Sequence, residues 1–279
     1  MITGHTRVFG LVGHPVRHSL SPAMHNELFR RLGVDAVYVT FDVSPDHAGD
    51  VAAAVRSLAL AGVNLTVPFK ERVLPGLDRL SPAAALAGAV NVVLREGESL
   101  VGHNTDGEGY VRALAEELDV RPAGRDCAVL GAGGTGRAVA AALAGEGARA
   151  VRLYNRTLAR AEAAVAALAP RFPGVAITAA PLAAFDGAPH DLVVNCTSGG
   201  AAPMVAGLSI EGLRPGAVWT DANYWMADPP QLATCARRGV RIQRGIGMLL
   251  HQGALSFELF TGLRVGSEAV RGVLDIGGW

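Results

Sequence analysis

Short apolar runs and amphipathic stretches alternate along the first hundred residues. Apolar runs at 7–12, 37–41 and 62–67 predict strands, and apolar positions at helical spacing predict helices at 21–32 and about 46–60. Ser21 is predicted to cap the first of these helices, because Pro22 then occupies the first helical position. This alternation predicts an α/β domain with a mostly parallel sheet.

The same alternation continues after a predicted helix at 106–118. Strands are predicted at 126–130, 150–154, 191–194 and 217–220, with a helix after each of the first two. Such a series is typical of a doubly wound parallel sheet. A final helix at 248–260 has no further strand to accompany, so we expect it to pack back on the first domain.

The predicted fold class is therefore α/β, with two domains and a cleft between them. Residues 1–107 and 246–279 are assigned to a discontinuous catalytic domain, and residues 108–245 to a nucleotide-binding domain. A chain of 279 residues is long enough for both domains. A cleft between two such domains is a common place for an active site, and we expect it there.

A complete glycine fingerprint follows the strand predicted at 126–130. The sequence Gly-Ala-Gly-Gly-Thr-Gly, with glycines at Gly131, Gly133, Gly134 and Gly136, leads directly into a helix-favouring stretch. In this pattern the first glycine permits a tight turn, the second admits a pyrophosphate, and the last allows close packing of helix and strand. The helix N-terminus supplies N–H groups for the anion. A flexible loop is the alternative, but the strand and helix favour a Rossmann-type dinucleotide site.

The residues after the next strand, Asn155, Arg156 and Thr157, indicate which dinucleotide is bound. A site for NAD would carry Asp or Glu here, whereas the cation of Arg156 can pair with the 2′-phosphate of NADP. Arg160 lies one helical turn further on and either reinforces this cation or faces solvent. A solvated surface charge is the alternative for Arg156. The sequence predicts NADP as the cofactor.

Composition and charge narrow the class of protein further. Lys plus Arg equal Asp plus Glu at 25 each, which gives no global electrostatic argument for nucleic acid or an anionic membrane as a partner. Neither a signal-like N-terminus nor an apolar run of transmembrane length is present. Three scattered cysteines fit neither a disulfide framework nor a metal cluster. We therefore expect a cytoplasmic protein with a small-molecule substrate and no metal.

Lys70 is the strongest candidate for proton transfer. It is the only lysine in the chain and lies two residues after the end of an Asn-x-Thr-x-Pro segment. A dehydrogenase needs a group that moves a proton while hydride passes to nicotinamide, and a lysine can do this when burial or a carboxylate tunes its pKa. Asp106 is the plausible carboxylate partner. The alternatives are a surface cation for Lys70 and a helix N-cap for Asp106.

Small polar groups gather in several segments before the fingerprint. The hydroxyls of Ser19 and Ser21 could hold a substrate carboxylate, or could serve as turn and cap residues. His14, His18 and His25 have no accompanying cysteine or carboxylate cluster, so a metal site is not expected. His25, on the first predicted helix, is expected to be a hydrogen-bonded structural residue. Hydroxyls and amides without metal-ligand spacing suit a small polyol or hydroxy acid.

Taken together, these segments resemble the shikimate dehydrogenase family nearly from end to end. The resemblance rests on His-Ser-Leu-Ser-Pro at 18–22, the segment 64–70, Gly-Ala-Val-Asn at 88–91, Asn-Thr-Asp at 104–106, the two nucleotide motifs, and the segments 195–200 and 247–254. It implies that Lys70 is the acid/base and that Asp106 is catalytic. It implies these substrate ligands: Ser19, Ser21, Asn64, Thr66, Asn91, Tyr224 and Gln252. For NADP it implies the four fingerprint glycines, Asn155, Arg156, Thr157, Arg160, Thr197 and Gly247.

The resemblance implies a reversible, NADP-dependent reduction of 3-dehydroshikimate to shikimate, in aromatic amino acid biosynthesis, by a monomer or homodimer. The alternatives are a quinate or aminoshikimate dehydrogenase of the same family, for which NAD is an alternative cofactor, and a non-catalytic NADPH-binding regulator. One loop departs from the family pattern. Asp221 and Tyr224 match it, but Met226 and Pro229 stand where proline and threonine are usual, and Asn223 stands where an apolar residue is common.

Overall fold

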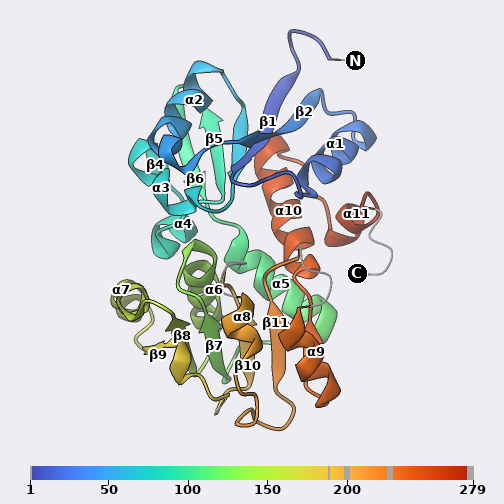
Figure 1. Cartoon of the computed structure of the whole chain (residues 1–279). Coiled ribbons are helices and arrows are strands. Elements are labelled where there is room, and N and C mark those ends of the chain that lie inside the picture. Colours follow the sequence, from blue (N-terminus) through green and yellow to red (C-terminus); the bar gives the residue numbers. More distant parts are fainter. Residues whose placement is uncertain (1, 188, 198–201, 225–228, 275–279) are drawn as a thin grey trace. The chain divides into compact units, whose positions relative to one another are not determined.

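The computed structural model describes residues 2–187, 189–197, 202–224 and 229–274. It divides into two compact units. Unit 1 comprises Met1–Thr105 and Leu250–Gly278, and unit 2 comprises Asp106–Leu249. The chain therefore leaves unit 1 once, forms unit 2, and returns (Figure 1).

Unit 1 contains a mixed sheet with the strand order β2-β1-β3-β5-β6-β4. Its strands are β1 (Arg7–Gly13), β2 (Ala36–Asp42), β3 (Gly62–Leu65), β4 (Arg79–Leu80), β5 (Val92–Glu96) and β6 (Ser99–His103). The first three strands are parallel, as the alternation predicts. The hairpin β5-β6, which the pattern did not predict, pairs antiparallel with β3. Its tight turn contains Gly97 at φ 63°, a conformation that favours glycine.

Short helices surround this sheet. They are α1 (Ser21–Arg31), α2 (Val51–Ser57), α3 (Phe69–Arg72), α4 (Pro82–Ala87) and α11 (Ser267–Arg271), and the end of α10 (Ile246–Thr261) joins them. The predicted helix at 46–60 is shorter, because a 3₁₀ turn at Pro45–Asp50, with His47 outside helical geometry, precedes α2.

The prediction that Ser21 caps α1 is wrong. The capping residue is Leu20, whose backbone is already helical, and no side chain caps this helix end. The Ser21 backbone N–H instead donates to Oγ of Ser19, 3.2 Å away. The Ser21 hydroxyl is therefore not used by the helix terminus.

The core of unit 1 has an aliphatic and an aromatic part. Val55, Val63, Leu65, Phe69 and Leu100 belong to one buried cluster. The aromatic part joins three elements, since Phe9 on β1 lies 5.7 Å from Phe29 on α1 and 4.6 Å from Phe260 on α10, measured between ring centroids. α10 thus supplies part of the core of unit 1, as we expected for the helix predicted at 248–260.

Unit 2 contains a parallel sheet with the order β12-β11-β10-β7-β8-β9. Its strands are β7 (Asp126–Leu130), β8 (Ala150–Asn155), β9 (Ala176–Pro181), β10 (Leu192–Asn195), β11 (Val218–Asp221) and β12 (Arg241–Gln243). The chain starts at β7, proceeds to β9, and then crosses to β10 on the other side of β7. Ligands of such sheets bind at this switch point, outside the carboxyl ends of the strands.

The helices of unit 2 cover a sheet whose central strands are buried on both faces. They are α5 (Asp106–Leu118), α6 (Gly134–Gly145), α7 (Leu158–Leu168), α8 (Ala202–Ala206) and α9 (Pro230–Arg237), together with the start of α10. β10 and β11 are buried throughout, as parallel strands between two helical layers are. Tyr154, Phe185 and Trp219 are the large aromatic side chains of one buried core cluster in this unit.

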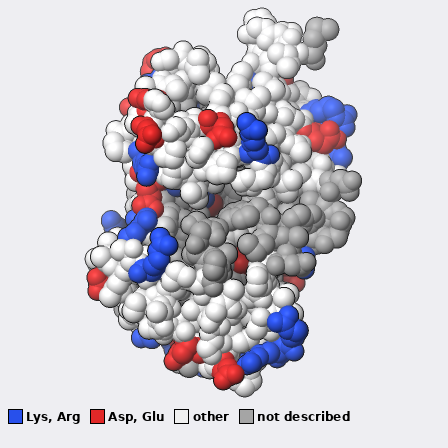
Figure 2. Space-filling model, viewed as in Figure 1, with Lys and Arg blue, Asp and Glu red and all other residues white. Residues whose placement is uncertain are grey.

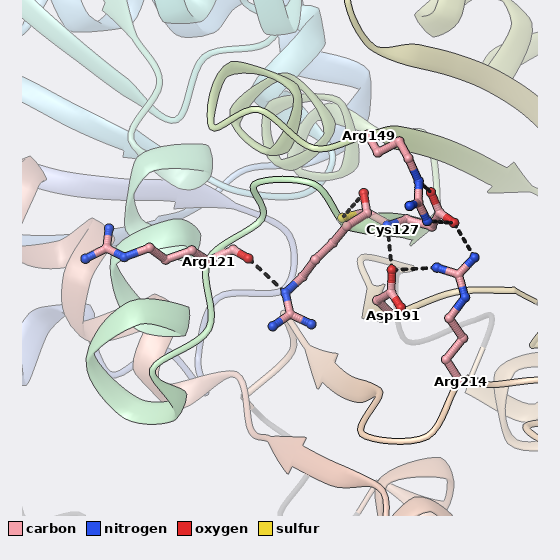
Figure 3. A network of polar contacts seen from close by, with 7 residues as sticks. Arg121, Cys127, Arg149, Asp191 and Arg214 are labelled. Carbon is pink, nitrogen blue, oxygen red and sulfur yellow. Dashed lines mark hydrogen bonds and ion pairs between the residues drawn. The ribbon is translucent and has the colours of Figure 1, made fainter.

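A network of charged side chains lies at the amino ends of the unit 2 strands, whereas the switch point lies at their carboxyl ends (Figure 3). Arg149 donates to both carboxylate oxygens of Asp126, and Arg214 pairs with Asp126 at 2.7 Å and with Asp191 at 2.8 Å. The Asp191 carboxylate also accepts the backbone N–H of Asp126. Two acidic and two basic side chains thus tie the starts of β7, β8 and β10 together, and this network serves the fold.

Charges on the molecular surface are mixed in sign. Figure 2 shows one face, where Lys and Arg side chains are interspersed with Asp and Glu. Among the helices that the structure describes, none is long and apolar enough to span a membrane.

Candidate active site

The glycine loop connects the carboxyl end of β7 to the first turn of α6. Gly131 has φ 101°, and a Cβ there would lie 2.9 Å from the carbonyl oxygen of Cys196 on the loop after β10. A Cβ on Gly136 would overlap the carbonyl oxygen of Gly131. A Cβ on Gly133, in contrast, would meet nothing within 4 Å. Two of the glycines are thus required by the loop itself, whereas Gly133 leaves space where a pyrophosphate can approach. Gly134 is the first residue of α6.

The predicted cofactor-selecting residues lie at the end of β8. The Asn155 side chain accepts the N–H of Ala132 at 3.1 Å and donates to the carbonyl oxygen of Thr157 at 2.8 Å, so it joins this loop to the glycine loop. Thr157 precedes the first residue of α7. Arg156 is exposed, and none of the described residues forms a hydrogen bond or ion pair with its side chain. Arg160 is exposed one turn further along α7. The site therefore offers a cation for a phosphate.

Asp106 is buried at the start of α5. Its Oδ2 accepts a hydrogen bond of 3.2 Å from the Thr135 hydroxyl, which lies in the first turn of α6. A Cβ on Gly107 would meet the backbone of Ala138 on α6, so the two helices approach closely at this point. The structure thereby places the predicted catalytic carboxylate beside the glycine loop of its own unit.

The loops that follow β10 and β11 hold a buried carboxylate. Asp221 accepts hydrogen bonds from Asn195 Nδ2 at 2.8 Å, and from the backbone N–H and Nδ2 of Asn223 at 2.8 and 2.7 Å. Burial raises the pKa of the Asp221 carboxyl above its ordinary value, while these hydrogen bonds oppose the rise. Thr197, predicted to bind the cofactor, donates its N–H and hydroxyl to Asn195 Oδ1.

Two other predicted residues of unit 2 lie near these loops. Gly247 is in the first turn of α10, where a Cβ would meet the carboxylate of Glu117 on α5, the end of a flexible side chain that can move aside. Tyr224 is half-buried after β11. The departing residue Met226 and the glycines at 199–200 lie outside the described residues.

In unit 1, three of the predicted substrate residues, Asn64, Asn91 and Gln252, belong to one buried hydrogen-bond network. Asn64, at the end of β3, donates to the Asn91 carbonyl at 3.2 Å and to the Ser256 hydroxyl at 3.1 Å. Asn91 donates to Thr105 Oγ1 at 2.8 Å and to Gln252 Oε1 at 3.4 Å. Both asparagine amides are therefore held in fixed orientations by residues from four segments of the chain.

Lys70 lies on the short helix α3, which is anchored by the fully buried Phe69. The carbonyl oxygen of Lys70 accepts the N–H of Val90 at 2.7 Å, so the lysine backbone is tied to the segment that carries Asn91. Its side chain is half-buried, as is that of Thr66, whose carbonyl accepts the N–H of Phe69. The structure brings the lysine backbone and the asparagine network to neighbouring strand ends of one sheet.

Ser19 lies between β1 and α1, and Ser21 is the first residue of α1. Ser19 is half-buried and Ser21 is buried, and they are linked by the backbone hydrogen bond described above. Because Ser21 does not cap the helix, its hydroxyl is compatible with the predicted contact to a carboxylate.

Comparison with known proteins identifies the family. Matching family models are described as shikimate dehydrogenase substrate binding domain (residues 11–93), shikimate / quinate 5-dehydrogenase (residues 113–210) and shikimate 5′-dehydrogenase C-terminal domain (residues 245–274). The shikimate dehydrogenase (NADP(+)) of Geobacter metallireducens is 45% identical over 267 residues, which cover 94% of this chain and 93% of that protein. The chain belongs to the shikimate dehydrogenase family.

Solved structures agree with this assignment. Shikimate 5-dehydrogenase from Listeria monocytogenes, in complex with shikimate and NAD, has a TM-score of 0.86 at 34% identity, covering 98% of this chain and 97% of that one. The enzyme from Thermus thermophilus, in complex with NADP(H) and shikimate, has a TM-score of 0.80 at 36% identity, covering 96% and 100%. The predicted family, α/β fold and oxidoreductase class are confirmed, and the predicted NADP matches the curated relatives.

Three residues of the buried network in unit 1, Tyr38, Thr105 and Ser256, were not predicted as site residues. The Tyr38 hydroxyl on β2 donates to Asn64 Oδ1 at 2.8 Å, and Ser256 lies one turn after Gln252 on α10. A polar residue among the apolar positions of the last helix was a signal for Ser256. His25 stacks on Tyr38 with ring centroids 4.4 Å apart, but its Nδ1 has no hydrogen-bond partner among the described residues, contrary to our expectation. Burial lowers the pKa of His25 to about 3, so the ring is neutral.

Proposed function

We propose that this chain catalyses the reversible, NADP-dependent reduction of 3-dehydroshikimate to shikimate in aromatic amino acid biosynthesis. The 45% identity to a shikimate dehydrogenase (NADP(+)) over nearly the whole chain carries this proposal. In it, residues 1–107 and 246–279 bind the substrate and residues 108–245 bind the dinucleotide. We further propose that the protein acts in the cytoplasm as a monomer or homodimer.

The geometry of unit 2 fits NADP. The open space at Gly133 and the N-terminus of α6 suit a pyrophosphate, and the exposed Arg156 suits a 2′-phosphate. Asn155, Thr157 and Arg160, on the same segment of the chain, would bind the cofactor together with Arg156. When bound, NADPH supplies the hydride for the ketone carbon. Thr197 and Gly247 would hold the part of the dinucleotide on the other side of the switch point.

Unit 1 would hold the ring. In this proposal Ser19 and Ser21 donate to the substrate carboxylate, while Asn64, Thr66, Asn91 and Gln252 bind ring oxygens. Tyr224 would contact the same substrate from unit 2. The amides of Asn64 and Asn91 are oriented before substrate arrives, because each is already hydrogen-bonded to protein. Such fixed polar groups lower the cost of ordering the site on binding.

Lys70 and Asp106 carry the proton chemistry of the proposal. The Lys70 ammonium donates a proton to the ketone oxygen as hydride reaches the carbon, and takes it back in the reverse reaction. Asp106 accepts a hydrogen bond from a substrate hydroxyl. Its hydrogen bond from the Thr135 hydroxyl ties the carboxylate to the first turn of α6.

The test is steady-state kinetics of a Lys70→Ala variant. Removing a general acid costs about 10²- to 10⁴-fold in turnover, and we expect kcat for shikimate oxidation to fall by this amount while KM changes far less. Arg72→Ala is the matched control, because Arg72 is an exposed cation on the same helix. Near-normal turnover of Lys70→Ala would refute the role of the lysine.

A second substrate calls for a parallel assay, because one matching family model is described as shikimate / quinate 5-dehydrogenase. Shikimate and quinate are each offered with NADP and with NAD. Highest kcat/KM for shikimate with NADP supports the proposal, and a preference for quinate would replace the substrate. NADPH binding without turnover of either acid would indicate a non-catalytic regulator instead.

A further inference from the structure

Two neighbouring strands of unit 2 end in the same kind of turn. Asn195 is the last residue of β10 and Asp221 the last residue of β11, and the two are paired in the sheet register. The Asn195 side chain accepts the N–H of Thr197 at 3.1 Å, and the Asp221 side chain accepts the N–H of Asn223 at 2.8 Å. Each polar side chain thus holds the backbone two residues onward, as in an Asx turn.

The two turns are joined to each other at two points. Asn195 Nδ2 donates to Asp221 Oδ2 at 2.8 Å, at the level of the strand ends. Further out, Asn223 Nδ2 donates to the carbonyl oxygen of Thr197 at 3.0 Å and to Asp221 Oδ1 at 2.7 Å. Asn195, Thr197, Asp221 and Asn223 therefore form a closed ring of hydrogen bonds, and Asn223 supplies its outer link.

The ring is held from both sides by backbone packing. A Cβ on Gly131 of the glycine loop would lie 3.1 Å from the backbone nitrogen of Thr197. A Cβ on Gly245, which follows β12, would lie 2.5 Å from the carbonyl carbon of Asn223. Neither approach leaves room for a side chain, so the positions of Thr197 and Asn223 are set closely relative to three loops at the carboxyl edge of the sheet.

The location of the ring indicates what it serves. A dinucleotide binds across the switch point of a doubly wound sheet, with one nucleotide on each half. The half with β7 and β8 carries the glycine loop and Arg156, which suit the pyrophosphate and the 2′-phosphate of the adenosine part. The half with β10 and β11 carries the ring, so the nicotinamide part falls to that half.

We propose that Asn223 is a positioning residue for the nicotinamide half of NADP, because it locks Thr197 on the loop after β10 to Asp221 on the loop after β11. The proposal rests on the proposed function, from which it takes the identity of the dinucleotide. Asn223 acts through the loops that it joins. The Asn223 side chain gives both of its N–H groups to the ring, so its contribution is the shape of the binding surface.

The test measures binding of two probes to Asn223→Ala, without turnover. NADPH reports the whole site through its fluorescence, and adenosine 2′-phosphate 5′-diphosphate, measured by calorimetry, reports the half that lacks nicotinamide. Loss of the amide removes two hydrogen bonds, and we expect the Kd of NADPH to rise about tenfold. The Kd of the adenosine fragment should change by less than about twofold, since its half of the site is untouched.

Kinetics add a second readout. In shikimate oxidation, KM for NADP should rise as the Kd of NADPH does, whereas KM for shikimate should stay near the wild-type value. Asn223→Asp keeps the shape but places a second carboxylate beside Asp221, so it should weaken NADPH more than Asn223→Ala does. Gln231→Ala is the matched control for general destabilisation, because it removes another buried amide-to-carbonyl hydrogen bond of unit 2, 3.0 Å to Leu208. It should lower the melting temperature without changing NADPH binding.

The outcomes separate the two proposals. Weaker NADPH binding with unchanged fragment binding supports the role of Asn223. Equal weakening of both probes, or no change in either, overturns it. A wild-type protein that binds NADPH but oxidises no shikimate would overturn the proposed function while leaving the Asn223 comparison readable.

Discussion

The glycine loop allows a structural glycine to be separated from a functional one by two alanine substitutions. In Gly136→Ala the new methyl would overlap the Gly131 carbonyl oxygen and lie 2.9 Å from its carbonyl carbon, inside the 3.4 Å at which ordinary contact begins. The obstructing group is backbone and cannot rotate away. In Gly133→Ala the methyl meets nothing within 4 Å, and φ −80°, ψ −175° is accessible to alanine.

The expected magnitudes differ accordingly. Overpacking of this kind costs about 1–3 kcal/mol, and each kcal/mol lowers Tm by about 2–4 °C in a domain of 150–250 residues. Gly136→Ala should therefore lower Tm by roughly 2–12 °C. Gly133 is the residue before α6, where glycine and alanine differ by less than about 1 kcal/mol, so Gly133→Ala should melt within about 4 °C of the wild type.

For NADPH binding, Gly133→Ala should have the large effect, although its effect on Tm is the small one. If a pyrophosphate occupies the space beside Gly133, the added methyl excludes it, and the Kd of NADPH should rise at least about tenfold in Gly133→Ala. Thermal melting without ligand measures Tm, and fluorescence titration with NADPH measures the Kd. Wild-type melting of Gly136→Ala would refute the steric argument. Wild-type affinity of Gly133→Ala would refute the close approach of the pyrophosphate.

Three further predictions concern selectivity, the substrate network and acid stability. Arg156→Ala should raise KM for NADPH by about 10- to 100-fold and KM for NADH by less than about threefold, because the lost cation faces the 2′-phosphate; equal losses in steady-state kinetics would contradict this. Tyr38→Phe leaves the Asn64 amide oxygen without its 2.8 Å donor, so KM for shikimate should rise about three- to tenfold while KM for NADP stays constant. Hydrogen bonding to Arg149 is the main cause that lowers the pKa of Asp126 in the folded state. The resulting stability is present above the ordinary pKa of about 4 and is lost as pH falls through the lower folded value, so Asp126→Asn should flatten the loss of stability below about pH 4 in denaturant titrations; an unchanged slope would count against it.

Local signals in the sequence were sufficient to predict the glycine loop and the basic residue of the nucleotide-binding unit. The strand, the glycine loop and the helix after it follow one another without interruption, and the loop conformation depends on glycines that are five residues apart at most. Gly131 and Gly136 are crowded by their own loop or by an adjacent strand end. Arg156 lies directly after the next strand, so its position also follows from short-range order.

The start of α1 shows how local signals can mislead. Ser21-Pro22 is a common start for a helix, yet Leu20 already has helical backbone angles and Ser19 accepts the N–H of Ser21. The competing turn satisfies the N–H of Ser21, and the N–H of Met24, which a Ser21 cap would have satisfied, donates to the carbonyl oxygen of Leu20. Patterns that rank single residues do not resolve such competition.

The sequence by itself therefore determined the central parallel strands, the glycine loop, the basic residue after β8 and a single lysine after β3, whereas β4, the hairpin β5-β6, β9 and β12 were not predicted. The tertiary structure decided which polar groups meet. Asn64 and Ser256 are 192 residues apart, and the ring that includes Asn223 needs β11 to lie beside β10 in register. The physical reason is that a strand specifies its own alternation and ends, whereas its neighbour in the sheet is chosen by the packing of the whole unit.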